Sequence, residues 1–442
     1  MISFFKKYFI VNAQVFLVIM QRMLQIIAGG ITILIVPWAL TEVEQGYYYT
    51  FGSILALQAF FELGLNYVVT QIAGHESARL NIDNIGNIQG DKRNASRLLS
   101  LITIVKRWYF FATPVFVVVI FIGGFYFFQQ KNDLSIQNWI GPWILVVLFT
   151  GFNLYLSPQL AILEGIGRIG EVARLRMYQS LAGMLILWIG LSKGIGLWAV
   201  SSVSGVAALT TFVWLKYFGN LHTASDLSLN TDDLIDWRRD IYPMQWRIAL
   251  SWIGGWIIWN SFTPMLFIHQ GPSEAGRVGL ALNIFMSITT LGTSWVNASL
   301  PSFLKYIALE QRMILNRLFL KTIASSMIFT SLLLIIFLVG VEILQTFNFV
   351  FAKRLAERPI LFCLALVALA NVFVSAAAVF MRAHKVEPML SQTLTMGILV
   401  GLTSWVGSQY SSLTMILGYT FLGIFVGLPW TIILLLRFYK RN

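Results

Sequence analysis

A succession of long apolar runs constrains the fold of this 442-residue chain more than any other feature of its sequence. A helix needs about 20 apolar residues to cross the hydrocarbon core of a bilayer. Twelve suitable runs occupy residues 15–40, 47–72, 109–128, 143–163, 177–192, 197–217, 246–269, 278–304, 319–341, 360–380, 389–406 and 413–436. Since 57% of the residues are hydrophobic and only 11% are charged, water cannot solvate the surface that such a chain would expose. The sequence therefore predicts an all-α polytopic membrane protein with twelve transmembrane helices.

Two motifs recur in the first and second halves of the chain. An arginine followed by a glycine pair occurs at residues 22–30 and again at 247–255, and Glu-x-Gly occurs at 44–46 and again at 274–276. Each motif takes a corresponding place in its half, near the first or the second apolar run. Parallel repeats of this kind are related by an axis along the membrane normal. We therefore expect two six-helix lobes around a central cavity.

The polar and acidic segment 222–240 follows the sixth run and is the natural boundary between the halves. We expect an N-terminal lobe at residues 1–221, a cytoplasmic linker at 222–240 and a C-terminal lobe at 241–442. Lysines and arginines collect in the joints on one side of the predicted spans, although the bases near Lys353 do not. The positive-inside rule then places both termini in the cytoplasm. Topology also explains the net charge of +12, so no nucleic-acid partner is expected.

Two short motifs resemble catalytic or cofactor-binding sites but lack the context that such sites need. The glycines of residues 165–170 match a dinucleotide fingerprint but follow no predicted strand, and His75-Glu76 lacks the second histidine of a zinc helix. The sequence has no Walker loop, and its single cysteine, Cys363, can form neither an internal disulfide nor a cysteine metal cluster. We expect no catalytic residue, no cofactor and no metal site.

Gln58, Glu62 and Asn66 recur every four residues in the second apolar run and would form one polar stripe on a helix. A carboxylate inside a membrane is costly unless it faces a cavity, finds a partner or takes up a proton. Glu62 is therefore a candidate for proton or cation coupling. A buried structural partnership of Glu62 with one arginine is the alternative, and both remain open because either would hide the charge.

Arg22 and Arg247 occupy corresponding places in the repeat, and each shares a helical face with a polar neighbour, Gln25 and Ser251 respectively. If these faces look into one cavity, two guanidinium groups could bind a pyrophosphate through bidentate hydrogen bonds. The alternative is that both arginines extend to the cytoplasmic interface and serve only as anchors.

Amides and hydroxyls of the seventh and eighth runs, Asn260 among them, could meet sugar hydroxyls. For any single one of them, hydrogen bonding between helices is the favoured alternative. The candidate substrate-binding residues are Arg22, Arg247, Gln25, Ser251, Gln58, Asn66 and Asn260, and Glu62 is the candidate for ion coupling.

Several stretches resemble one known family. They are TEVEQGYYYTFGSILALQAFFELGLNYVVTQIAGHESAR, YPMQWRIALSW, LEGIGRIGEVARLR and RAHKVEP. Together with the twelve runs and the mid-chain segment, they are similar to the O-antigen flippases, which translocate lipid-linked oligosaccharides in bacterial polysaccharide synthesis. The resemblance implies membership of the multidrug/oligosaccharidyl-lipid/polysaccharide exporter superfamily, with two six-helix lobes forming a V-shaped cavity.

The same resemblance implies a function. The substrate would be an oligosaccharide repeat unit on undecaprenyl pyrophosphate, moved by alternating access from the cytoplasmic to the periplasmic leaflet of the bacterial inner membrane. The cationic cavity of the family would correspond to Arg22 and Arg247. Membrane lipids would surround the protein, and a polysaccharide polymerase and a chain-length regulator are candidate partners.

Two other classes compete with this interpretation. A multidrug cation exporter of the same superfamily would share the architecture, but it should favour acidic and aromatic cavity residues over paired arginines. A membrane-embedded polysaccharide polymerase or acyltransferase should carry a large periplasmic loop or an embedded His/Asp pair, and the sequence offers neither. A lipid II flippase is a further relative that commonly has additional helices.

Overall fold

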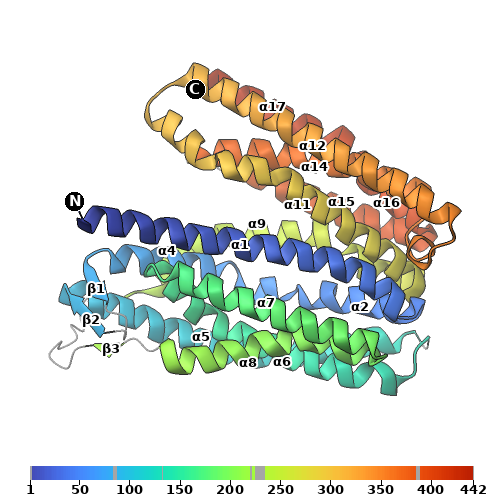
Figure 1. The fold of residues 1–442 in the computed structure, drawn as a ribbon, viewed down its shortest axis with the longest axis horizontal. Helices are drawn as coiled ribbons and strands as arrows, with labels where there is room; N and C mark the ends of the chain where they lie inside the picture. Colours follow the sequence, from blue (N-terminus) through green and yellow to red (C-terminus); the bar gives the residue numbers. More distant parts are fainter. Residues whose placement is uncertain are drawn as a thin grey trace. The chain divides into compact units, whose positions relative to one another are not determined.

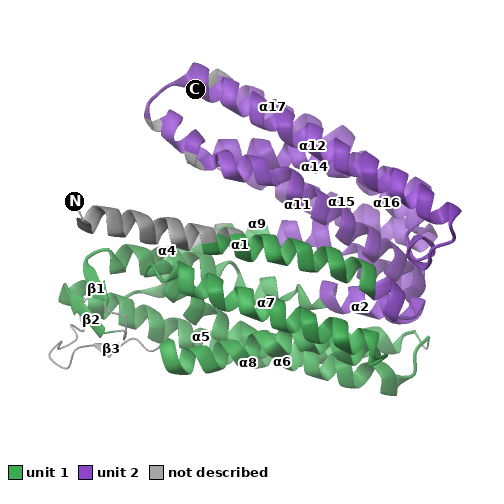
Figure 2. Ribbon diagram, in the orientation of Figure 1, with its two compact units in different colours: residues 1–35, 54–252 green, residues 36–53, 253–442 purple. Residues whose placement is uncertain are grey.

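A computed structural model of the protein describes residues 2–82, 87–131, 133–219, 222–223, 234–384 and 389–441. The chain forms two compact units (Figure 2). Unit 1 comprises Met1–Ile35 and Ile54–Trp252, and unit 2 comprises Val36–Ser53 and Ile253–Asn442. Helices dominate both units (Figure 1).

Unit 1 contains most helices of the first half of the chain, three very short strands and the start of the second half as far as Trp252. Its elements are α1 (Ile2–Ala39, except the last residues), α3 (Gln58–Glu62), α4 (Leu65–Ser77), β1 (Leu80–Ile82), β2 (Asn87–Gly90), α5 (Lys92–Gln129), α6 (Ile136–Gly165), α7 (Ile169–Ser192), a 3-10 turn (Gly196–Val200), α8 (Ser201–Phe218), β3 (His222–Thr223), a π-helical turn (Trp237–Ile241) and the first half of α9 (Tyr242–Asn260). Helices α5, α6 and α8 pack side by side (Figure 1).

Unit 2 contains one helix and the last residues of α1 from the first half of the chain, together with the second half from Ile253 onward. Its elements are α2 (Glu42–Leu55, except the last residues), the end of α9, α10 (Phe262–His269), α11 (Pro272–Ala308), α12 (Arg312–Thr346), α13 (Val350–Lys353), α14 (Arg358–Ala383), α15 (Leu390–Tyr410), α16 (Ser412–Phe421), a π-helical turn (Leu422–Gly427) and α17 (Leu428–Arg441). Helices α11, α12 and α14 pack together, and the rings of Phe319 and Phe380 stack at 4.0 Å in their core.

The prediction of an all-α polytopic membrane protein is confirmed. Among the described residues, eight helical spans are long and apolar enough to cross a membrane, and the bent pair Glu42–Glu62 and Leu65–Ser77 gives a ninth. The other three predicted spans fall on α7, on α9 with α10, and on α15. All twelve predicted spans therefore lie on helices, and nine of them have the length and hydropathy of a complete membrane crossing.

The prediction of one continuous second span at residues 47–72 is wrong. Leu63 and Gly64 both adopt left-handed backbone angles, with φ of 48° and 67°, and the flanking helices bend by 44°. A left-handed residue ends a helix because its carbonyl no longer lies along the helix axis, and glycine adopts this conformation at little cost. The break therefore separates α3 from α4, and a turn at residues 56–57 separates α2 from α3.

Two further spans are not continuous α-helices. The seventh predicted span, at residues 246–269, is divided between α9 and α10 at Ser261, and the twelfth, at 413–436, contains the π-helical turn Leu422–Gly427. Turns of π-helix in membrane helices leave local backbone irregularity that apolar periodicity does not signal.

A three-stranded sheet joins two loops of unit 1 that are far apart in sequence. β1 and β2 pair antiparallel, with Leu80 opposite Gly90, and β2 pairs in parallel with β3, with Ile88 opposite Thr223. The sheet fastens the beginning of the predicted linker to the loop before α5. Most of that linker, including residues 224–233, lies outside the described residues.

The repeated Glu-x-Gly motifs meet inside unit 2, where α2 crosses α11. A Cβ atom on Gly46 would lie 2.0 Å from the carbonyl oxygen of Pro272, and one on Gly276 would lie 2.8 Å from the backbone nitrogen of Gly46. Gln45 Nε2 also donates a 2.9 Å hydrogen bond to the Gly276 carbonyl. Glycine on both helices permits this close backbone approach. The crossing explains why α2 belongs with unit 2.

The glycine pairs of the other repeated motif differ from each other. A Cβ on Gly254 would lie 2.9 Å from the Thr393 carbonyl oxygen of α15, so close helix packing requires glycine there. Gly29, Gly30 and Gly255 have open space where a Cβ would stand.

The two units and the two predicted lobes are different divisions of the chain. Unit 2 includes α2, and unit 1 includes the first half of α9. The units group residues by contact, whereas the lobes are expected from sequence repeats. The lobe boundaries at residues 221 and 241 therefore remain a prediction.

Candidate functional site

Arg22 and Gln25 lie on α1, in the part of that helix that belongs to unit 1, and both side chains are exposed. Gln25 Nε2 lies 3.4 Å from the hydroxyl of Ser180 on α7. Among the described side chains, no acid forms an ion pair with Arg22. The guanidinium of Arg22 can therefore bind an external anion without first breaking a described pair.

Arg247 and Ser251 lie on α9, also within unit 1. Their backbone is helical, so their four-residue spacing keeps them on one helical face. The direction of both side chains lies outside the described part of the structure. A common anion site formed by Arg22 and Arg247 thus remains a prediction.

The polar stripe of the second span forms one hydrogen-bonded network. Gln58 Nε2 donates to one carboxylate oxygen of Glu62, and Asn66 Nδ2 lies 3.3 Å from the other. Asn66 also donates to Ser157 Oγ at 2.9 Å and accepts from the Tyr109 hydroxyl at 3.1 Å. These hydrogen bonds thus link a largely buried carboxylate on α3 to side chains of α5 and α6.

The hydrogen bonds of this network cross the helix break, which the sequence did not predict. The left-handed residues Leu63 and Gly64 directly follow Glu62, yet Gln58, Glu62 and Asn66 remain in contact across them. A Cβ on Gly64 would lie 2.2 Å from Ile248 Cγ2, so α9 packs directly on the break. Ile248 is adjacent in sequence to Arg247, and the two candidate groups of unit 1 therefore belong to neighbouring elements. Left-handed Gly64 is signalled only weakly, by an isolated glycine in an apolar run.

Asn260 lines a separate cavity of about 80 Å³ within unit 2. The other polar side chains of its lining are Ser53, Thr263, Asn283, Thr289, Asn371 and Tyr419, and no charged residue is among the described lining residues. Asn371 Nδ2 donates to the Tyr419 hydroxyl at 3.1 Å, and the Ser53 and Thr263 hydroxyls lie 3.0 Å apart. Trp259 and Phe262 add aromatic surface.

Asn371 and Tyr419 are polar residues of this cavity that the sequence analysis did not select. Asn371 is the one amide within the very apolar predicted span at residues 360–380, and that isolation is the signal that could have found it. Tyr419 gives no such signal, because tyrosines are frequent throughout the chain. The candidates of unit 1 and Asn260 of unit 2 belong to two separately described sites.

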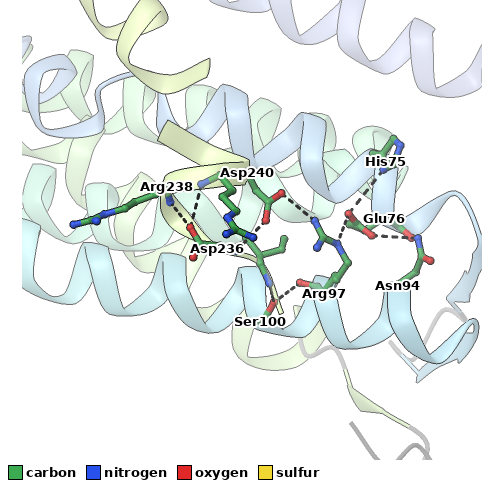
Figure 3. A network of polar contacts seen from close by, with 10 residues as sticks. His75, Glu76, Asn94, Arg97, Ser100, Asp236, Arg238 and Asp240 are labelled. Carbon is green, nitrogen blue, oxygen red and sulfur yellow. Dashed lines mark hydrogen bonds and ion pairs between the residues drawn. The ribbon is translucent and has the colours of Figure 1, made fainter. Parts of the chain in front are cut away.

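Charged residues form a third group in unit 1, at the ends of α4 and α5 (Figure 3). Glu76, which is only 5% exposed, accepts from Arg97 Nε at 2.9 Å and from Asn94 Nδ2 at 3.2 Å. The same guanidinium lies 3.3 Å from Asp240, in the π-helical turn before α9. Asp236 accepts from the backbone nitrogens of Arg238 and Arg239 and caps that turn. The group fastens the end of the predicted linker to α4 and α5.

Among the described residues, no cluster of three histidine, cysteine, aspartate or glutamate side chains is placed to hold a metal ion. The described site groups of unit 1 and unit 2 are thus built from amides, hydroxyls, aromatic rings and individual charges. Such groups can bind and orient a polar solute by hydrogen bonds.

Comparison with known proteins finds similarity to solved structures only. No protein-family model matches the sequence, and no curated protein matches it. An inward-facing multidrug resistance MATE family transporter of the MOP superfamily is similar with a TM-score of 0.65 at 12% identity, over 97% of this chain and 99% of that one. The lipid II flippase MurJ, in an inward closed conformation, is similar with a TM-score of 0.61 at 12% identity, over 95% of this chain and 86% of that one.

The MATE multidrug transporter DinF-BH, solved in complex with a ligand, gives a TM-score of 0.60 at 14% identity, over 96% of this chain and 95% of that one. Structural similarity at identities this low shows the fold alone. This multi-pass membrane protein has the fold of MATE transporters of the MOP superfamily and of the lipid II flippase MurJ.

Proposed function

We propose that this protein is a flippase for oligosaccharide repeat units carried on undecaprenyl pyrophosphate. It moves them from the cytoplasmic to the periplasmic leaflet of a bacterial inner membrane, with both of its termini in the cytoplasm. A polysaccharide polymerase and a chain-length regulator are its candidate partners. The likeness to the lipid II flippase MurJ supports a lipid-linked substrate for this fold.

The observation that carries the proposal is the uncharged cavity of unit 2. Asn260, Asn371 and Thr263 present amide and hydroxyl groups there, beside the rings of Trp259 and Phe262. Amides and hydroxyls can both donate and accept, as sugar hydroxyls require. A volume of about 80 Å³ suits a few hydroxyl groups at one end of a glycan rather than a whole oligosaccharide.

The anionic part of the substrate requires a cationic group elsewhere. Arg22 supports this role because it is exposed and no described acid pairs with it. Arg247 is its counterpart in the sequence repeat. Guanidinium groups bind phosphate oxygens bidentately and keep their charge at every physiological pH. In the proposed cycle the pyrophosphate loads on these arginines, the glycan enters the aqueous interior, and alternating access then exposes the glycan to the periplasm.

A multidrug cation exporter is the second candidate. Glu62 favours it, because a buried carboxylate network could neutralise a cation, and the multidrug transporter DinF-BH shares the fold. The uncharged lining of the unit 2 cavity opposes it, since a cation in a low-dielectric site needs a compensating negative charge.

Gene deletion and complementation test the proposal. Cells without the protein should accumulate lipid-linked oligosaccharide on the inner leaflet, and the wild-type chain should restore export. Arg22→Ala and Arg247→Ala should fail to restore it although the protein reaches the membrane in normal amounts. Arg79→Ala is the matched control, because Arg79 is exposed and lies between α4 and β1.

Two results would contradict the proposal. One is normal export of the oligosaccharide by the double variant of Arg22 and Arg247. The other is unchanged surface polysaccharide in the deletion strain together with new sensitivity to organic cations, which would favour the exporter.

A further inference from the structure

An aromatic groove of about 350 Å³ lies in unit 1, lined by residues other than those of the polar network and the charged group described above. Its walls are almost entirely apolar and include Leu63, Trp108, Trp237, Tyr242, Trp246 and Ala249. Three indoles line this groove. Packing alone does not account for them, because Trp108 and Trp246 remain 39% and 42% exposed. A concave groove lined by several partly exposed tryptophans is typical of a site for an apolar ligand.

The elements that carry these rings are well fixed. Tyr242 and Trp246 lie four residues apart on one face of α9, and Trp108 lies on α5. Trp237 is the first residue of the π-helical turn, and its ring lies 5.1 Å from that of Trp108. The turn is held by the Asp236 cap and by the ion pair of Asp240 with Arg97 (Figure 3). The groove is therefore formed before any ligand arrives.

Basic residues flank the groove in sequence. Lys106 and Arg107 directly precede Trp108, Arg238 and Arg239 directly follow Trp237, and all four side chains are exposed. The two acids nearby are already engaged, because Asp236 caps the turn and Asp240 pairs with Arg97. None of the four bases forms an ion pair among the described side chains. An apolar groove whose tryptophans are adjacent in sequence to exposed bases is complementary to an amphiphile with an anionic head.

The groove also adjoins the proposed transport site. Leu63, in its wall, directly follows Glu62 and belongs to the helix break, and Trp246 directly precedes Arg247 on α9. An amphiphile whose apolar portion lies against the indoles would therefore carry its head toward elements that bear the candidate transport residues.

We propose that this groove binds the first isoprene units of a polyprenyl pyrophosphate and that the four flanking bases hold its phosphates before they load on Arg22 and Arg247. The inference rests on the proposed function and assigns the lipid part of the substrate to named residues. Isoprene units carry methyl branches and double bonds, so they are stiffer than saturated acyl chains and lose less entropy on flat aromatic walls. The groove thus selects the carrier lipid independently of the glycan.

Photolabelling of the full-length protein in nanodiscs of phosphatidylethanolamine and phosphatidylglycerol tests this inference. The probe is sugar-free undecaprenyl phosphate with a diazirine on its first isoprene unit. Label should appear on peptides that contain Trp108, Trp237 or Trp246. Excess unlabelled undecaprenyl pyrophosphate should suppress it, and dioleoyl phosphatidic acid should not.

Variants of the groove sharpen the test. Trp108→Ala combined with Trp246→Ala should lower labelling about tenfold or more, since each ring contributes substantial apolar contact. Trp198→Ala is the matched control, because Trp198 is 46% exposed in unit 1 and does not line the groove. Arg107→Gln with Arg238→Gln leaves the apolar walls intact. It should weaken labelling by the phosphate probe and leave labelling by a neutral undecaprenol probe unchanged.

Equal competition by phosphatidic acid would overturn the inference and identify the groove as part of an ordinary interfacial aromatic belt. Unchanged labelling in both groove variants would overturn it as well. The assay needs neither a glycan nor translocation, so its outcome separates from that of the proposed function. Specific labelling without oligosaccharide export would contradict the flippase alone, whereas normal export without groove labelling would contradict the groove alone.

Discussion

Glu62 is held by two amides, one on its own short helix and one beyond the helix break. No ion pair to Glu62 occurs among the described side chains, and the side chain of Arg247 is outside that set. Glu62 could couple transport to an ion or support the structure. The two interpretations predict different effects of one substitution at this residue.

Glu62→Gln preserves the size of the side chain, keeps one acceptor oxygen, replaces the other by an amide donor and removes the charge. If Glu62 couples transport to an ion gradient, the variant should fold normally but transport no faster with an imposed proton or sodium gradient than without one. Transport in proteoliposomes with and without the gradient measures this. Gradient-dependent transport equal to that of the wild type would leave Glu62 a structural role only.

Arg97 serves two carboxylates at once, the buried Glu76 and the more exposed Asp240. Arg97→Ala should lower the free energy of unfolding by about 3 kcal/mol, because it removes the guanidinium that pairs with the buried Glu76 carboxylate. Thermal unfolding of the detergent-purified protein, followed by tryptophan fluorescence, measures the change.

Arg79→Ala provides the comparison for this variant, since Arg79 is exposed and should change stability by no more than about 0.5 kcal/mol. Equal stability of the two variants would show that the ion pairs of Arg97 contribute nothing net. That result would also show that the pair of Arg97 with Asp240 does not hold the end of the linker against α5.

At the scale of elements, the crossing of α2 and α11 depends on two glycines that face each other. Gly276→Ala should destabilise unit 2 by about 1 to 3 kcal/mol, because the new methyl group would overlap the backbone of Gly46. Gly30→Ala, where a Cβ meets nothing within 4 Å, should instead be neutral or stabilise α1 slightly. Thermal unfolding of both variants checks the crossing, because only Gly276→Ala should lower stability. A neutral Gly276→Ala would contradict it.

The helices were predictable from the sequence because a membrane span must be long and apolar, and run length alone records both properties. The break at Leu63 and Gly64 was not, since left-handed backbone angles leave no trace in hydropathy. The sheet of β1, β2 and β3 escaped prediction because its strands are two to four residues long and because β3 is far in sequence from β2, its partner.

The candidate site was predictable in part. The spacing of Gln58, Glu62 and Asn66 correctly indicated side chains in contact, although the helix is not continuous. Spacing within one helix cannot reveal contacts that arise from tertiary packing. Such contacts bring Ser157 and Tyr109 to Asn66, and Asn371 to Tyr419.

At the scale of the whole molecule, the single cysteine allows a direct test of orientation. Cys363 is buried in α14, where a small apolar residue should replace it at little cost, so Cys363→Ala gives a background without thiols. Cysteines introduced at Lys131 and Arg312 should then react from opposite sides of the membrane, with Arg312 on the cytoplasmic side. Impermeant maleimide applied to intact and opened cells measures this. Labelling of both positions from one side would contradict the predicted topology.

Transport by the purified protein addresses the central claim most directly. The wild-type protein and the double Arg22→Ala, Arg247→Ala variant would be reconstituted into liposomes that contain undecaprenyl-pyrophosphate-linked oligosaccharide. The glycan exposed to an impermeant sugar-modifying enzyme would then be followed over time. We predict that the wild type makes glycan from the inner leaflet accessible and that the variant leaves it protected. Protected glycan in both, together with exchange of an organic cation by the wild type, would contradict the flippase and identify a cation transporter.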